Sequence, residues 1–127
     1  MNLDLLLEED KAFLLRKGWA VEVTKADNQE IYVIIRNFPL SSRYSPRQTD
    51  VLIRILQGYP DAPLDMFWTK PDVLLAENNQ KPNQADSYET FLGEQWQRWS
   101  RHLNGWRGGI DGLESFYAAA LHKELTS

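Results

Sequence analysis

The spacing of apolar residues changes at Gly18, and this change restricts the chain to a fold that combines helix and sheet. Before Gly18, leucines and Phe13 recur three or four positions apart, which predicts a helix over residues 3–17. Asn2 is placed to cap the start of this helix and Gly18 to end it. Residues 20–25 then alternate between apolar and polar side chains, as in a half-buried strand. A helix is therefore followed directly by sheet.

Three further segments have the composition of strands. Residues 31–35 are rich in β-branched side chains, and the short polar segment 25–29 joins them to the preceding strand, which predicts a β-hairpin. Residues 39–46 carry a proline at each end and read as a loop. Residues 49–56 predict a third strand and residues 66–69 a fourth. Strands in this order predict a four-stranded antiparallel meander.

The rest of the chain ends in a helix. Residues 76–87 are polar and irregular, residues 88–106 are aromatic without a clear period, and Gly108-Gly109 interrupts the chain. A final helix is predicted from apolar residues that fall on one face: Ile110, Leu113, Tyr117, Ala120 and Leu121. The expected fold class is α+β, with helices packed on one face of an antiparallel sheet. The length of 127 residues suits a single domain, 1–127.

The composition excludes several kinds of function. The chain has no cysteine, so it has no thiol nucleophile, disulfide or thiolate metal site. Its two histidines have no metal-ligand spacing and no glycine-rich phosphate loop occurs, so no metal and no cofactor are expected. A net charge of −4 gives no general attraction to nucleic acid or to an anionic membrane. Residues 1–4 lack the cationic start of a secretory signal, and a cytoplasmic location is expected.

The segment Tyr59-Pro60-Asp61-Ala62-Pro63 follows the third predicted strand. Its two prolines fix the backbone and remove two hydrogen-bond donors, so the chain leaves the sheet in a rigid, extended form. Alone, this motif is equally typical of a proline-rich turn. The whole order of a helix, three strands, Tyr-Pro-x-x-Pro and a fourth strand resembles the ubiquitin-conjugating-enzyme superfamily, which also contains non-catalytic variants and RWD domains.

The resemblance extends to later landmarks of that superfamily. Lys81-Pro82-Asn83 stands where conjugating enzymes have His-Pro-Asn, and Trp99-Ser100 stands where they have Trp-Ser. Counting between these landmarks places the catalytic cysteine at Phe91. The stretch from Phe91 to His102 is similar to a bacterial branch found beside ubiquitin-like proteins and activating enzymes. The resemblance thus implies a ubiquitin-like protein and an activating-enzyme homologue as partners.

Without a thiol, a covalent carrier needs a hydroxyl. Ser87 and Thr90 precede Phe91 and Ser100 follows it, and each is a candidate nucleophile if a base activates it. His102 is the candidate base, two residues after Ser100. Asn83, if it matches the family's asparagine, is a candidate donor to an oxyanion. The alternative for each hydroxyl, and for Asn83, is a structural role in a turn or cap.

The tryptophan- and arginine-rich segment 96–107 also permits an interpretation as a nucleic-acid-binding surface. Bases stack on aromatic rings and arginine adds charge, as in proteins that bind single-stranded nucleic acid. The acidic total favours packing instead, and Trp99 is expected to be buried against the sheet or the last helix. The leading hypothesis is a conjugating-enzyme-like protein that binds or carries a modifier without a thioester. The alternative is a non-catalytic, RWD-like interaction domain.

Overall fold

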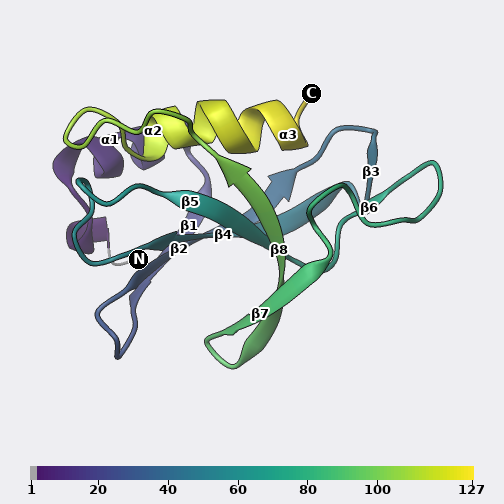
Figure 1. Ribbon diagram of the computed structural model, residues 1–127, viewed down its shortest axis with the longest axis horizontal. Coiled ribbons are helices and arrows are strands. Elements are labelled where there is room, and N and C mark those ends of the chain that lie inside the picture. Colours follow the sequence, from purple (N-terminus) through teal and green to yellow (C-terminus); the bar gives the residue numbers. More distant parts are fainter. Residues whose placement is uncertain (1–2) are drawn as a thin grey trace.

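The computed structural model describes residues 3–127. The expected cap at Asn2 lies outside these residues. Helices cover one face of an antiparallel sheet, and two hairpins extend from the sheet on the opposite side (Figure 1). The architecture is α+β, with a helix before the sheet and a helix after it. Within the described residues, none of the helices is long and apolar enough to cross a membrane.

The first helix is shorter than predicted. A 3-10 turn at Leu3–Leu5 comes before helix α1 at Glu8–Lys17, because Leu7 adopts an extended backbone with φ −62° and ψ 152°. The predicted end is right: Gly18 takes the left-handed conformation, with φ 71°, and its N–H donates to the carbonyl of Leu14.

The main sheet has six strands, so the predicted four-stranded meander is wrong in its strand number. The strand order is β1-β2-β4-β5-β8-β7, and every neighbouring pair is antiparallel. The two additional strands come from the aromatic segment, which forms a hairpin whose second strand pairs with β5. The strands are β1 Ala20–Lys25, β2 Ile31–Pro39, β4 Gln48–Ile55, β5 Asp65–Lys70, β7 Ser87–Phe91 and β8 Glu94–His102.

Two short strands, β3 (Tyr44–Ser45) and β6 (Leu74–Leu75), form a separate two-stranded sheet beside the main one. The last helical run continues without a break through α2 (Leu113–Phe116), a π-helical segment (Tyr117–His122) and α3 (Lys123–Leu125). Ile110 lies before this run and is 71% exposed, so its predicted place on the apolar face is wrong.

The end of α3 is attached to the middle of the chain. The N–H of Ser41 donates to the carbonyl of Leu125 at 2.9 Å, and the hydroxyl of Tyr44 donates to the carbonyl of Glu124 at 2.7 Å. The guanidinium of Arg101 on β8 bonds the Glu124 carboxylate at 2.6 Å. These contacts hold the last turn of the helix over the core, where Leu125 is fully buried.

The main core lies between the sheet and the helices, and Trp99 is at its centre. The Trp99 ring is fully buried and stacks on Phe67, with ring centroids 5.3 Å apart. Its indole N–H donates to the hydroxyl of Thr69 at 3.0 Å. The prediction that Trp99 is buried is therefore confirmed.

A second, smaller cluster lies on the sheet face that points away from the helices, called the open face below. The Phe91 ring, at the end of β7, lies 5.2 Å from Tyr32 on β2 and 5.0 Å from Trp68 on β5. The sheet therefore curls, because its last strand reaches a strand four places away in the order. The buried members of this cluster are Tyr32, Ile34, Leu52, Trp68, Phe91 and Trp96.

Candidate functional site

The β7–β8 hairpin and the loop before it carry all five candidate residues, but at two separate ends. Thr90 pairs with Gln95 beside the turn, where its side chain is exposed. Ser87 begins β7 at the opposite end of the hairpin, which also receives the last residues of β8, Ser100 and His102. Thr90 is therefore separated from the other candidates by the length of the hairpin.

Asn83 joins the group at the base of the hairpin through its backbone. Its carbonyl accepts a hydrogen bond from the guanidinium of Arg101 at 2.9 Å, and the neighbouring Gln84 carbonyl accepts from the N–H of Ser100 at 3.0 Å. Ser87 faces Arg98 across the strand pair. The structure thus brings Asn83, Ser87 and Ser100 to one end of the hairpin.

The position expected for a catalytic cysteine is occupied by a core residue. Phe91 is only 7% exposed and packs edge-on against Tyr32 and Trp68. A nucleophile at this position would be covered by aromatic rings, and access to a reactive carbonyl would require the hairpin to move. The backbone here belongs to a strand, where each amide can be used by the sheet ladder.

His102 has a partner that sequence reasoning missed. Its Nδ1 contacts a carboxylate oxygen of Asp65, which is its cross-strand neighbour on β5. This contact leaves Nε2 as the nitrogen that can accept a proton from a hydroxyl. The two residues lie 37 positions apart, and only the strand pairing brings them together. No local signal in the sequence could have identified Asp65.

Ser100 and His102 are not joined in the same way. Between the pairs Phe67–Trp99 and Asp65–His102, strand β8 has one more residue than β5, which is the arrangement of a β-bulge. The bulge interrupts the alternation of side chains, so the spacing of two residues does not place both side chains on one face. In the part of the chain that the structure describes, no hydrogen bond joins the Ser100 hydroxyl to the His102 ring.

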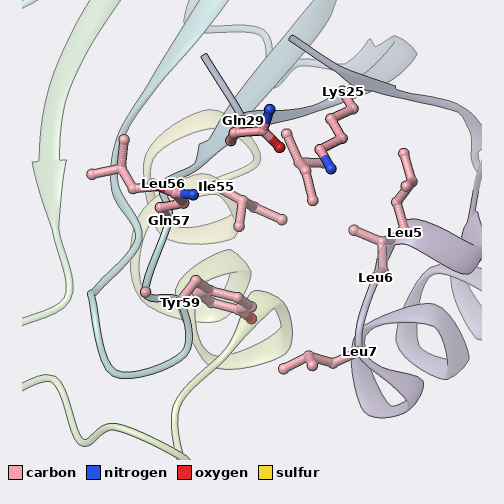
Figure 2. A pocket seen from close by; sticks show the side chains of 11 residues that line it. Leu5, Leu6, Leu7, Lys25, Gln29, Ile55, Leu56, Gln57 and Tyr59 are labelled. Atoms are coloured by element: carbon pink, nitrogen blue, oxygen red, sulfur yellow. The ribbon is translucent and has the colours of Figure 1, made fainter. Parts of the chain in front are cut away.

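A pocket of 260 Å³ opens next to the Tyr-Pro-x-x-Pro segment (Figure 2). Leu5, Leu6 and Leu7 form one wall, while Ile55 and Tyr59 lie across from them. Lys25 at the end of β1 and Gln29 in the turn that follows also line the pocket. Leu5 and Leu7 are each 38% exposed at its rim. The lining is mainly apolar, and the hydroxyl of Tyr59 is already bonded to Asp10, so the pocket is suited to binding an apolar side chain.

The hydroxyl of Tyr59 forms part of a buried polar contact behind this pocket. It donates to the carboxylate of Asp10 at 2.6 Å, and the N–H of Leu113 donates to the other oxygen at 3.2 Å. Burial raises the pKa of Asp10 above its ordinary range, although both hydrogen bonds oppose that rise. Burial and the adjacent carboxylate also raise the pKa of Tyr59.

The glycine that precedes Leu113 is required by this contact. A Cβ atom added at Gly112 would lie 3.0 Å from the Asp10 carboxylate and 3.0 Å from the Tyr59 hydroxyl. The Tyr-Pro-x-x-Pro segment is also held by Trp106, whose indole N–H donates to the carbonyl of Pro60 at 2.9 Å. The motif that indicates the family therefore joins α1, the sheet and the start of α2.

Comparison with known proteins supports the resemblance drawn from these landmarks. Residues 6–126 match the family model described as Prokaryotic E2 family E, where E2 denotes the ubiquitin-conjugating-enzyme class. The search of curated proteins and the search of solved structures each gave no match. Membership in such a family points to a role in a ubiquitin-like pathway, and the sequence has no cysteine with which to form a thioester. The chain belongs to prokaryotic E2 family E, a family of conjugating-enzyme-like proteins.

Proposed function

We propose that this protein acts in a cytoplasmic ubiquitin-like pathway, where it binds the modifier or carries it without a thioester. Its partners are the modifier and a homologue of the activating enzyme. The observation that supports this proposal is the environment of Phe91, which stands where the sequence comparison expects the nucleophile and is packed among aromatic rings. A chain with this fold and no thiol must hold its modifier by contacts or by an ester.

The covalent form of the proposal uses the base of the β7–β8 hairpin. A hydroxyl oxygen attacks the thioester carbonyl of the modifier on the activating enzyme, a C–O bond forms, and the C–S bond breaks. The activating enzyme leaves with its thiolate, and the hydroxyl proton passes to Nε2 of His102, which Asp65 orients. Ser100 and Ser87 are the candidate hydroxyls at the same end of the hairpin as His102, and Thr90 is the candidate at the far end. The Asn83 amide would donate to the oxyanion.

The alternative is a non-catalytic, RWD-like interaction domain that binds the modifier only by contacts. It is favoured by the bulge between Trp99 and His102, and by the lack, within residues 3–127, of a hydrogen bond from Ser100 to the imidazole. The pocket beside Tyr59 then has the more important role, because its apolar lining suits a protruding side chain.

The test is incubation with the cognate activating enzyme, ATP and modifier, followed by denaturing gels. An adduct that survives mild thiol but is cleaved by hydroxylamine is an ester. Ser87→Ala, Thr90→Ala and Ser100→Ala identify its position, and His102→Gln and Asp65→Asn should slow its formation. Ser42→Ala, an exposed loop serine, is the matched control.

Two results would overturn parts of the proposal. If the activating enzyme becomes charged but no adduct forms on this protein, the covalent form is wrong and the contact-only form remains. If calorimetry also shows no binding of the modifier to the protein, alone or with the charged activating enzyme, the proposed function itself is wrong.

A further inference from the structure

Two pairs of neighbouring residues have a sequence in which a side chain can react with its own backbone: Asn104-Gly105 after β8 and Asp111-Gly112 before α2. In such a pair, the backbone nitrogen of the glycine attacks the side-chain carbonyl carbon of the residue before it, and a cyclic succinimide forms. Glycine permits this approach because it has no Cβ atom to obstruct it. The sequence contains no other Asn-Gly or Asp-Gly pair.

The Asp111-Gly112 pair is protected by the fold. Asp111 is only 6% exposed, and its carboxylate accepts the backbone N–H of Arg107 at 2.8 Å. The nitrogen that would attack is also engaged, because the N–H of Gly112 donates to the hydroxyl of Ser115 at 3.0 Å. Both reacting groups would have to leave these hydrogen bonds before a ring could close.

The Asn104-Gly105 pair has no such protection. Both residues are exposed, in the turn that connects β8 to Trp106. Among residues 3–127, the N–H of Gly105 has no hydrogen-bond acceptor and the Asn104 side chain makes no hydrogen bond. Ring closure here therefore breaks no hydrogen bond within the described chain.

Other exposed asparagines differ from Asn104 in both respects. The side-chain oxygen of Asn28 accepts the N–H of Glu30 at 3.1 Å, and that of Asn78 accepts the N–H of Gln80 at 3.0 Å. Each is also followed by a residue with a side chain, which obstructs attack by the next backbone nitrogen. Sequence and structure together thus single out Asn104.

We infer that Asn104 is a site of spontaneous deamidation. The nitrogen of Gly105 bonds to the side-chain carbonyl carbon of Asn104, and the side-chain amide nitrogen leaves as ammonia with the proton that the glycine nitrogen gives up. Water then opens the ring. Attack at the side-chain carbonyl gives aspartate, and attack at the backbone carbonyl gives isoaspartate, in which the main chain runs through the side-chain carbon. In total, water is consumed, ammonia is released and an uncharged amide becomes a carboxylate.

This change falls between two residues that have roles described above. The candidate base His102 lies two positions before Asn104, and Trp106, which bonds the carbonyl of Pro60, lies two positions after it. Either product places a negative charge on this connection, and isoaspartate also lengthens its main chain. The inference goes beyond the proposed function, because Asn104 is not among the candidate site residues.

The experiment is incubation of the whole protein in warm, mildly alkaline buffer, followed by trypsin and mass spectrometry. Cleavage after Arg101 and Arg107 releases residues 102–107 as one peptide. This peptide should gain the mass of an amide-to-acid conversion as time passes, and it should separate into an aspartate form and an isoaspartate form. After incubation in heavy-oxygen water, the new carboxylate should carry the heavy oxygen. A sample digested before incubation measures any conversion during the digestion.

Two controls separate the effect of the fold from the effect of sequence. Asp111→Asn gives the protected position an Asn-Gly pair as well, and circular dichroism checks that this variant remains folded. Position 111 should then convert about tenfold or more slowly than Asn104, because it must open locally before it can react. In the parent, the peptides that carry Asn28 and Asn78 should keep their mass, and this comparison does not depend on any variant.

A synthetic peptide of residues 102–107 with blocked ends, incubated in the same way, shows that the conditions permit the reaction. The inference is wrong if this peptide converts while Asn104 in the folded protein does not. It is also wrong if position 111 of the folded Asp111→Asn variant, or Asn28 and Asn78 of the parent, convert as fast as Asn104. None of these measurements involves the modifier or the activating enzyme, so a failure here leaves the proposed function untouched.

Discussion

The hydroxyl of Tyr59 donates a 2.6 Å hydrogen bond to the carboxylate of Asp10, which lies 49 positions earlier in the chain. This bond connects the Tyr-Pro-x-x-Pro segment to the first helix. The same carboxylate accepts the N–H of Leu113 at the start of the last helix, so one buried side chain joins three elements.

Replacing Tyr59 with Phe should lower the free energy of unfolding by about 1–2 kcal/mol at neutral pH. The hydroxyl stabilises the charged form of Asp10, so its removal raises the pKa of Asp10 further. The folded variant then binds a proton at Asp10 more tightly than the folded parent does. Its loss in free energy of unfolding should therefore shrink as the pH falls. Urea unfolding of the parent and Tyr59→Phe over a pH series checks this.

Asp10 should make the free energy of unfolding decrease as the pH rises. Its pKa in the fold is raised above the ordinary value of 3.8, so this carboxyl favours folding least above its folded pKa and most below 3.8. Asp10→Asn should remove that slope, whereas Glu8→Gln on the exposed side of α1 should keep it. The same slope in the parent and in Asp10→Asn would contradict this account of the buried carboxyl.

Replacing Trp99 with Ala should destabilise the protein by about 3–5 kcal/mol, because the ring is fully buried against Phe67. Trp99→Phe keeps an aromatic ring but loses the hydrogen bond to Thr69. Its stability should therefore lie between that of the parent and that of the alanine variant. Leu92→Ala, at a half-exposed turn position, is the control. An unchanged melting temperature for Trp99→Ala would show that the ring contributes nothing to the core.

A cysteine at the position of Phe91 should not create a working conjugating enzyme. The thiol of Phe91→Cys would replace a ring that is 7% exposed, and burial among apolar groups raises a thiol pKa. It should react with Ellman's reagent only after unfolding, and the variant should be about 3 kcal/mol less stable. Leu92→Cys, one residue later and 50% exposed in the parent, should react at once. Equal reaction rates would show that the aromatic cluster opens readily.

Gln97 should hold the segment between β5 and β7 in place. Its amide group donates to the carbonyls of Val73 and Ala85 at 3.0 and 2.9 Å, and its oxygen accepts from the N–H of Val73 at 2.7 Å. Gln97→Leu removes these bonds, so limited proteolysis should cut between residues 73 and 85 much faster than in the parent. Gln95→Leu, an exposed change on the same strand, should leave the cutting rate unchanged.

The first four strands of the main sheet could be predicted because each has a recognisable alternation, a β-branched run or, in β5, adjacent aromatic residues. The β7–β8 hairpin could not, although the turn at Leu92-Gly93 has a suitable glycine. The reason lies in β8, where Trp96 is buried on the open face and Trp99 in the main core. These two tryptophans are three positions apart and the buried residue Gln97 between them is polar, so β8 shows neither a regular alternation nor an apolar run.

The candidate site was only partly predictable for a related reason. The Tyr-Pro-x-x-Pro segment is a local feature, and with the order of helix and strands around it, it indicated the family correctly. The contact of His102 with Asp65 and the position of the Arg54 guanidinium over the Trp68 ring arise only from the pairing of strands. Register depends on hairpin geometry and on the β-bulge after Trp99, and neither can be read from residue types alone.

The attachment of α3 to the loop around Ser41 and Tyr44 has a consequence for how the protein is made. Leu125 is part of the main core, and its carbonyl holds the backbone of Ser41. While the chain is being synthesised, the sheet can assemble as its strands emerge, but the core beneath the last helix stays uncovered until residues 113–125 have left the ribosome. Nascent chains that stall before Leu125 would therefore expose Trp99 and its neighbours to chaperones.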